Sequence, residues 1–139
     1  MNHENENSFV LTEDDCKANK DKIKELLLSA GRPGMERLLD WIEQKTDFFT
    51  APASTKYHLA VKGGLAKHSL NVYELLSGKV SSGLLDIKKE TVIITALLHD
   101  LCKVNFYVLE KKNVKEGTKV NAYGSEVANW VEKEVWTVH

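Results

Sequence analysis

In the first third of the chain, apolar residues recur with the period of an α-helix. Four of them share the i, i+3, i+4, i+7 spacing of one helix face: Ile23, Leu26, Leu27 and Ala30. This pattern predicts a helix over 15–30. A second helix with one apolar face follows, marked by Met35, Leu38, Leu39 and Ile42. Gly31 suits the end of the first helix and Pro33 the start of the second, so we expect a helical hairpin here.

The middle of the chain predicts a connector and two more helices. The connector covers 53–64, and its last two residues, Gly63 and Gly64, allow a close approach between backbone segments. A third helix is expected over 65–77, a loop over 78–83 and a fourth helix over 87–102. Within the fourth helix, the segment VIITALL (92–98) is apolar on every side, which is typical of a buried helix.

After Lys103 the pattern changes to β-branched and aromatic residues around a polar stretch that contains Gly117 and Gly124. This favours a small β-hairpin or an extended arm. A helix over 125–136 is the competing interpretation, since its apolar residues also fit a helical period. Taken together, the pattern predicts an all-α fold, a helical bundle with a hairpin or arm near the C-terminus. We expect residues 1–14 to be a flexible polar tail and 15–139 to form one domain.

Composition narrows the class of protein. The chain has 139 residues, which suits one domain, and its 19 basic and 20 acidic residues give a net charge of -1. That balance does not favour a broad nucleic-acid-binding surface. The two cysteines, Cys16 and Cys102, do not form a disulfide framework. The chain shows neither a signal-peptide pattern nor a run of about 20 apolar residues, so we expect a cytoplasmic protein with no membrane partner.

His99 and Asp100 are adjacent at the end of the apolar fourth segment. Burying an unpaired carboxylate costs several kcal/mol, so Asp100 needs a neutralising partner, and a divalent cation is a suitable one. His68 lies three residues after Leu65 and four before Val72, on the same helix face, and could meet the His-Asp pair. Two imidazoles and a carboxylate suit Mn, Fe, Ni or Zn.

The strings GGLAKHSLNV (63–72) and ALLHDLCKVNFY (96–107) resemble the pattern of the HD superfamily of metal-dependent phosphohydrolases. The lone histidine and the His-Asp pair are 31 residues apart. The run KYHLAVKGGLAKHS (56–69) is similar to the HD domain of bacterial 3′→5′ exoribonucleases and of phage-type HD hydrolases. The resemblance covers about residues 56–107. It implies a helical bundle that hydrolyses a phosphoester bond in a nucleotide or oligonucleotide.

The resemblance also implies roles for individual residues. His68, His99 and Asp100 would hold the metal, which would activate the attacking water. Asp100 would also orient that water. Lys103 matches the basic residue that follows the His-Asp pair and would stabilise charge on the phosphate. His58 would contact the phosphate or the leaving group.

One departure from the HD pattern bears on activity. The family takes its last ligand, an Asp, from a later helix, and no Asp follows Asp100 in this chain. We therefore expect 15–139 to be an HD domain that lacks its C-terminal part. The candidates for a substitute ligand, from this chain or a second one, are Glu110, Glu116, Glu126, Glu132, Glu134 and His139.

Two alternatives to the enzyme follow from the missing ligand. One is a non-catalytic, shortened HD-type module that binds a nucleotide or a protein, and the other is an inactive fragment of a longer hydrolase. The expected partners are a nucleotide or short oligonucleotide and a second copy of the chain, with Tyr123, Trp130 and Trp136 as a contact surface.

Overall fold

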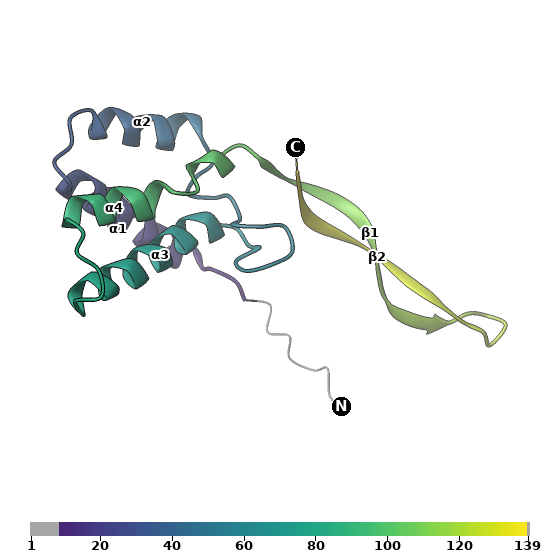
Figure 1. Ribbon diagram of the computed structural model, residues 1–139. Helices are drawn as coiled ribbons and strands as arrows, with labels where there is room; N and C mark the ends of the chain where they lie inside the picture. The colour runs from purple at the N-terminus through teal and green to yellow at the C-terminus, as the bar shows by residue number, and fades with distance from the viewer. Residues whose placement is uncertain (1–8, 139) are drawn as a thin grey trace.

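The computed structural model describes residues 9–138, in which four α-helices are followed by a long two-stranded hairpin (Figure 1). The helices are α1 (Glu13–Ser29), α2 (Met35–Lys45), α3 (Gly64–Ser81) and α4 (Lys89–Leu98), and a short 3₁₀ turn covers Leu101–Lys103. α1 contacts the other three helices, and α3 packs on α4. The helices therefore surround one common core.

The N-terminus of α1 is fixed by a capping box. The Thr12 side chain accepts a hydrogen bond from the Asp15 backbone, and the Asp15 carboxylate accepts one from the Thr12 backbone. The helix consequently begins at Glu13, two residues earlier than the sequence pattern predicts. Of the predicted tail, residues 9–14 are thus described, whereas residues 1–8 lie outside the described residues.

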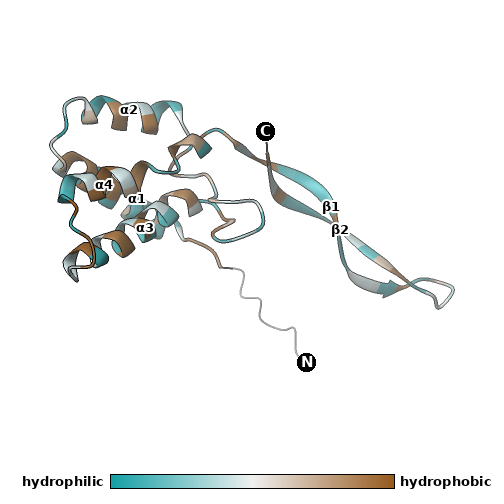
Figure 2. Ribbon diagram, viewed as in Figure 1, coloured by the Kyte–Doolittle hydropathy of each residue, from teal (hydrophilic) through white to brown (hydrophobic). Residues whose placement is uncertain are grey.

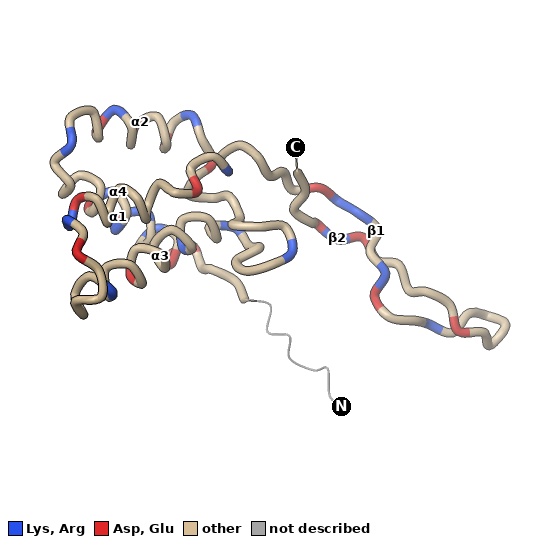
Figure 3. The backbone as a smooth tube through the Cα atoms, viewed as in Figure 1, with Lys and Arg blue, Asp and Glu red and all other residues tan. Residues whose placement is uncertain are grey.

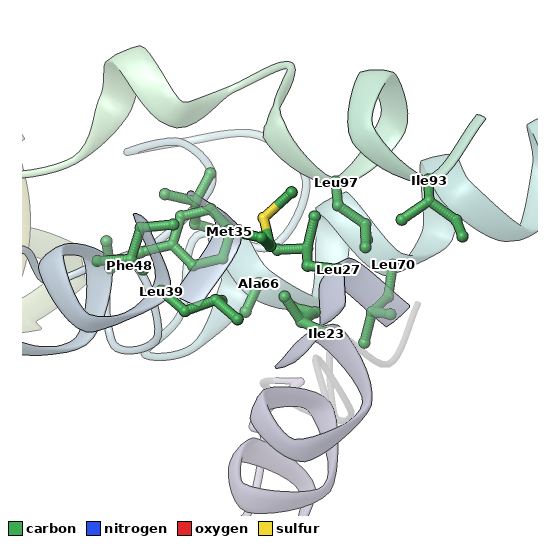
Figure 4. Close-up of a cluster of buried hydrophobic side chains, with 12 residues drawn as sticks. Ile23, Leu27, Met35, Leu39, Phe48, Ala66, Leu70, Ile93 and Leu97 are labelled. Carbon is green, nitrogen blue, oxygen red and sulfur yellow. The ribbon is translucent and has the colours of Figure 1, made fainter. Parts of the chain in front are cut away.

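The core is formed by apolar side chains from all four helices and the segment after α2. Figure 4 shows their packing, with Ile23 and Leu27 of α1 close to Leu97 of α4. The buried cluster consists of Ile23, Leu27, Met35, Leu39, Ile42, Phe48, Ala51, Leu65, Ala66, Leu70, Ile93 and Leu97. The predicted inward positions of the first two helices are mostly confirmed, although Leu26, Ala30 and Leu38 are only partly buried.

α3 and α4 differ in length from the helices that the sequence predicts. α3 continues through Gly78 to Ser81, so the predicted loop begins too early. α4 covers only ten residues, since the chain leaves the helix just before Asp100. Its burial is also one-sided: Val92, Ile93, Ala96 and Leu97 are buried, whereas Thr91 and Thr95 are exposed. The prediction of a helix buried on every side is wrong.

Gly63 and Gly64 lie where the connector passes close to the start of α3, as predicted. A Cβ atom on Gly64 would stand 2.0 Å from the backbone oxygen of Leu59. Gly63 has a φ of +81°, a left-handed conformation that glycine adopts readily, and a Cβ there would meet the Cys16 sulfur at 2.6 Å. The glycine pair therefore brings the loop that carries His58 against α3.

The C-terminal part is a β-hairpin of β1 (Tyr107–Val120) and β2 (Glu126–Val138). The strands are antiparallel, with an irregularity between Lys115 and Thr118. The turn is closed by the side-chain oxygen of Asn121, which accepts hydrogen bonds from the backbones of Tyr123 and Ser125. The predicted hairpin is confirmed, and the competing helix over 125–136 is wrong.

The all-α fold class is also wrong, because the hairpin is a large element. Its strands have 14 and 13 residues, and β-branched residues along both favour extended backbone. The result is a mixed fold in which helices predominate. Each strand contacts mainly the other, and the hairpin projects away from the helices (Figure 1).

The two parts of the chain differ in how their apolar residues are arranged. In the helical part, apolar residues form faces that turn toward one another, whereas in the hairpin short apolar stretches are separated by polar ones (Figure 2). Within residues 9–138, no helix has both the length and the apolar character needed to cross a membrane.

Candidate metal centre

Three side chains, one from α3 and two from the segment directly after α4, meet at one point. His68 is on the second turn of α3, and His99 and Asp100 directly follow the last residue of α4. The backbone leaves the α-helical conformation at Asp100 (φ -105°, ψ 19°). Because α3 packs against α4, the structure brings together the three residues that the sequence nominated as ligands.

Their ligand atoms form a nearly equilateral triangle. Nε2 of His68 lies 3.2 Å from Nε2 of His99, and each of these nitrogens lies 3.2 Å from Oδ2 of Asp100. Atoms bound to one ion at about 2.1 Å lie about 3.0 Å apart at octahedral angles and about 3.4 Å apart at tetrahedral ones. The observed separations fall between these values, so the group could hold a metal ion.

The hydrogen bonding of His99 leaves the correct nitrogen free for a metal. Its Nδ1 is 2.7 Å from the backbone oxygen of Ala96. A carbonyl oxygen can only accept, so Nδ1 carries the proton and the Nε2 lone pair points into the triangle. A bond of this kind fixes both the tautomer and the ring orientation of a ligating histidine.

His68 is held in the neutral form that binds metals. Burial lowers the pKa of His68 below its ordinary value of 6.5, and the nearby His58, His99 and Lys103 act in the same direction. Asp100 opposes this shift by favouring the imidazolium. The net lowering keeps the Nε2 lone pair of His68 available near neutral pH.

This shift predicts a pH-dependent stability of the metal-free protein. The pKa of His68 is lower in the folded chain than in the unfolded one, so the unfolded chain binds more protons as the pH falls. We expect the free energy of unfolding to decrease as the pH drops below about 6.5. Urea unfolding at pH 7.5, 6.5 and 5.5 would measure the slope. His68→Asn should have a shallower slope, and an unchanged slope would contradict the assignment to His68.

Lys103 lies at the edge of the triangle, one turn after Asp100. Its Nζ is 3.3 Å from Oδ2 of Asp100 and donates a hydrogen bond to the backbone oxygen of Ala53 at 3.1 Å. The side chain is 29% exposed, so its charge is only partly screened by solvent. Lys103 thus places a fixed positive charge beside the three ligands, where the sequence predicted it.

His58 lies beside the triangle and is exposed. Its ring centroid is 4.7 Å from that of His68. The backbone oxygen of His58 accepts a hydrogen bond from the Ser54 hydroxyl, and that of the next residue, Leu59, accepts one from the Ala53 backbone. Leu59 has a φ of 52°, a conformation that costs a leucine about 1–3 kcal/mol. The loop is thus held in one shape that presents His58 to the ligands.

A hydrogen-bonded clamp near the site was not predicted from the sequence. The backbone N–H of Asn105 donates to the Asp47 carboxylate at 2.6 Å, and the Asp47 backbone donates to the Asn105 side chain at 3.2 Å. Asn105 also donates to the backbone oxygen of Lys45 at 3.2 Å. These bonds join the segment after Lys103 to the end of α2. The only local signal is that asparagine tolerates the left-handed conformation, here with φ 56°.

The clamp can be tested at Asn105. Asn105→Ala removes the two hydrogen bonds that the Asn105 side chain makes. It also places alanine, which tolerates the left-handed conformation less well than asparagine, at a φ of 56°. We expect a loss of about 1–3 kcal/mol in the free energy of unfolding. Asn105→Gly loses the same bonds without the strain and should be about 1 kcal/mol more stable than the alanine variant. Equal stability of both variants in urea unfolding would contradict a strained Asn105.

Among the described residues, the group of potential metal ligands consists of His68, His99 and Asp100. The five glutamates considered as substitute ligands are all on the strands of the hairpin, and none belongs to this group. His139 lies outside the described residues. The three candidate ligand side chains are 17–31% exposed, so the site is partly open to solvent rather than fully enclosed.

Comparison of this chain with protein-family models, with curated proteins and with solved structures finds no match in any of the three.

Proposed function

We propose that this protein is a metal-dependent phosphohydrolase of the HD type, acting on a phosphoester bond of a nucleotide or a short oligonucleotide. The observation that carries the proposal is the triangle of His68, His99 and Asp100, with all three sides 3.2 Å long. Two imidazoles and one carboxylate favour Mn, Fe, Ni or Zn over Mg or Ca. A divalent ion at this position would activate water and polarise a phosphoryl oxygen.

The residues around the triangle support phosphoester chemistry in particular. Lys103 provides a positive charge that can stabilise the negative charge developing on phosphate oxygens. The hydrogen bond to the Ala53 oxygen fixes the ammonium group before substrate arrives. His58 is exposed beside His68 and can donate a proton or a hydrogen bond to the leaving group. Asp100 accepts contacts at Oδ2, and its other oxygen is suited to orient the attacking water.

The partial exposure of the site supports a catalytic centre over a structural one. Structural metal sites are usually closed by four protein ligands, whereas catalytic sites leave at least one position for water or substrate. Three protein ligands on one side of an ion leave such positions open. His58 lies 4.7 Å from His68 between ring centroids, and the Lys103 ammonium lies 3.3 Å from Asp100, so a phosphate on the ion could reach both.

The test uses the full-length chain. Calorimetric titration with Mn²⁺, Ni²⁺ and Zn²⁺, and with Fe²⁺ under anaerobic conditions, should give one ion per chain. A panel of nucleotides and short oligonucleotides with added Mn²⁺ should then release phosphate or nucleotide. Absence of both binding and hydrolysis would overturn the proposal. Tight binding without turnover would instead favour the non-catalytic module that the missing fourth ligand suggests.

A further inference from the structure

The hairpin has two faces of different character. Side chains directly opposite one another in an antiparallel pair share a face. One face, here called the Trp face, contains Tyr107, Leu109, Lys111, Asn113 and Lys115 of β1 opposite Val138, Trp136, Glu134, Glu132 and Trp130 of β2. The other, here called the valine face, contains Val108, Glu110, Lys112 and Val114 opposite Thr137, Val135, Lys133 and Val131.

Exposed apolar side chains collect on the Trp face. Leu109, Trp130 and Val138 are 47%, 60% and 55% exposed, and Val120, on the same face beyond the irregularity, is 70% exposed. The valines of the valine face are half-buried. A two-stranded hairpin is only marginally stable on its own in water, so burial of the Trp face would supply the stabilisation that the isolated hairpin lacks.

The charges of the hairpin are divided between its strands. β1 has four lysines and two glutamates, whereas β2 has three glutamates and one lysine, and the difference is visible in Figure 3. On the Trp face, Lys111 lies opposite Glu134. Lys111 forms a long ion pair with Glu132, at 3.9 Å, and both side chains stay at least 66% exposed. These charges are therefore available to a partner, because exposed pairs of this kind contribute little within the hairpin.

We propose that the Trp face is the interface of a homodimer in which two hairpins pack face to face about a two-fold axis parallel to the strands. This symmetry places β1 of one copy over β2 of the other. Lys111 then faces Glu134 of the second copy, and Leu109 faces Trp136 of the second copy. Every contact occurs twice, as a two-fold interface requires. The face is thus complementary to itself in both charge and apolar character.

The valine face does not have this property. Its central pair is Lys112 opposite Lys133, so the same symmetry would bring four ammonium groups together. Two-fold packing about an axis across the strands would place β1 over β1 on the Trp face, and with the axis at Lys111 or Asn113 it would bring lysines together. Charge complementarity thus favours the Trp face and an axis parallel to the strands.

The size of the face predicts a dimer that dissociates on dilution. A strand of 14 residues is about 46 Å long at about 3.3 Å per residue, and two strands are about 10 Å wide. Packing two such faces buries on the order of 1,000 Å², which is near the lower limit of specific interfaces. We therefore expect a monomer–dimer equilibrium at micromolar concentrations. The dimer is independent of the reaction proposed for the metal centre.

Sedimentation velocity of the full chain over a range of concentrations tests the dimer, with charge reversal as the probe. K111E and E134K should each raise the dimer dissociation constant at least tenfold, because each creates two like-charge contacts across the axis. A mixture of the two variants should form a heterodimer, since each copy then faces an opposite charge. Within each variant hairpin, residues 111 and 134 still carry like charges in that mixture. Recovered association would therefore report contacts between the two copies.

The matched control is K112E, the same substitution on the valine face, which should leave the dissociation constant within about threefold of the original. Circular dichroism would confirm that all variants retain their secondary structure. Four results would overturn the proposal: a wild-type chain that stays monomeric at all concentrations, a dimer insensitive to K111E, equal effects of K111E and K112E, or a mixture that fails to associate.

Discussion

His99→Ala should abolish metal binding while leaving the helical core folded. The imidazole of His99 supplies one corner of the 3.2 Å triangle, and loss of a direct ligand should exceed the 10–100-fold loss of affinity typical of its supporting residues. We expect the affinity for Mn²⁺ or Zn²⁺ to fall more than 100-fold and phosphoester hydrolysis to reach background. The side chain is 31% exposed at the end of α4, so stability should change by less than about 1 kcal/mol.

His58→Ala is the matched control for this experiment. His58 is close to His68 but is not one of the three converging ligands. Its removal should leave the metal affinity within a few-fold of the original and lower the rate of hydrolysis, because its proposed contact is with the substrate. Calorimetric titration and the hydrolysis assay would measure the two effects separately. If both variants lost the metal equally, the ligand set would have to include His58.

Gly64→Ala should destabilise the protein by about 3 kcal/mol, near the upper end of typical overpacking costs. The new Cβ would lie 2.0 Å from the backbone oxygen of Leu59 and 3.0 Å from its backbone carbon. A backbone group cannot move aside as the end of a flexible side chain can, so the loop and α3 would have to separate. For a domain of 5–15 kcal/mol total stability this is a large change.

Gly78→Ala provides the opposite result in the same helix. Apart from its chain neighbours and the backbone of its own helix, nothing lies within 4 Å of a Cβ at Gly78, and alanine is about 1 kcal/mol more favourable than glycine inside a helix. Urea unfolding should therefore show a gain of about 1 kcal/mol for Gly78→Ala and a loss for Gly64→Ala. Similar effects of both substitutions would mean that the loop approaches α3 less closely than the structure indicates.

Local pattern was sufficient to predict much of the helical part and to nominate the three residues that converge at the candidate metal centre. The helical spacing of Leu65 and His68 and the cost of burying Asp100 were enough to nominate the three ligands. Two errors arose where local and long-range effects compete. Glycine disfavours a helix, so a loop was predicted at Gly78, yet α3 continues past it to Ser81. The fourth helix was expected to begin at residue 87, but α4 begins at Lys89, and no side chain caps it.

The supporting contacts of the site could not be predicted, because they join residues far apart in the sequence. The hydrogen bond from Lys103 to Ala53 spans 50 residues, and that between Asn105 and Asp47 spans 58. No periodicity relates such positions, and without a template their partners become known only from the folded chain. The prediction of an all-α fold class was wrong for a different reason. The hairpin was expected at the correct position, but its length was underestimated.

The clamp between Asp47 and Asn105 has a mechanical consequence. Residues 99–107 form a continuous path from two of the candidate ligands, through Lys103, to the first residue of β1, so the long hairpin is attached close to the candidate metal centre. The clamp ties this path to the end of α2 at Asn105. Along the chain, the clamp lies between the hairpin and Lys103. The hairpin is thus anchored to α2 independently of the candidate metal centre.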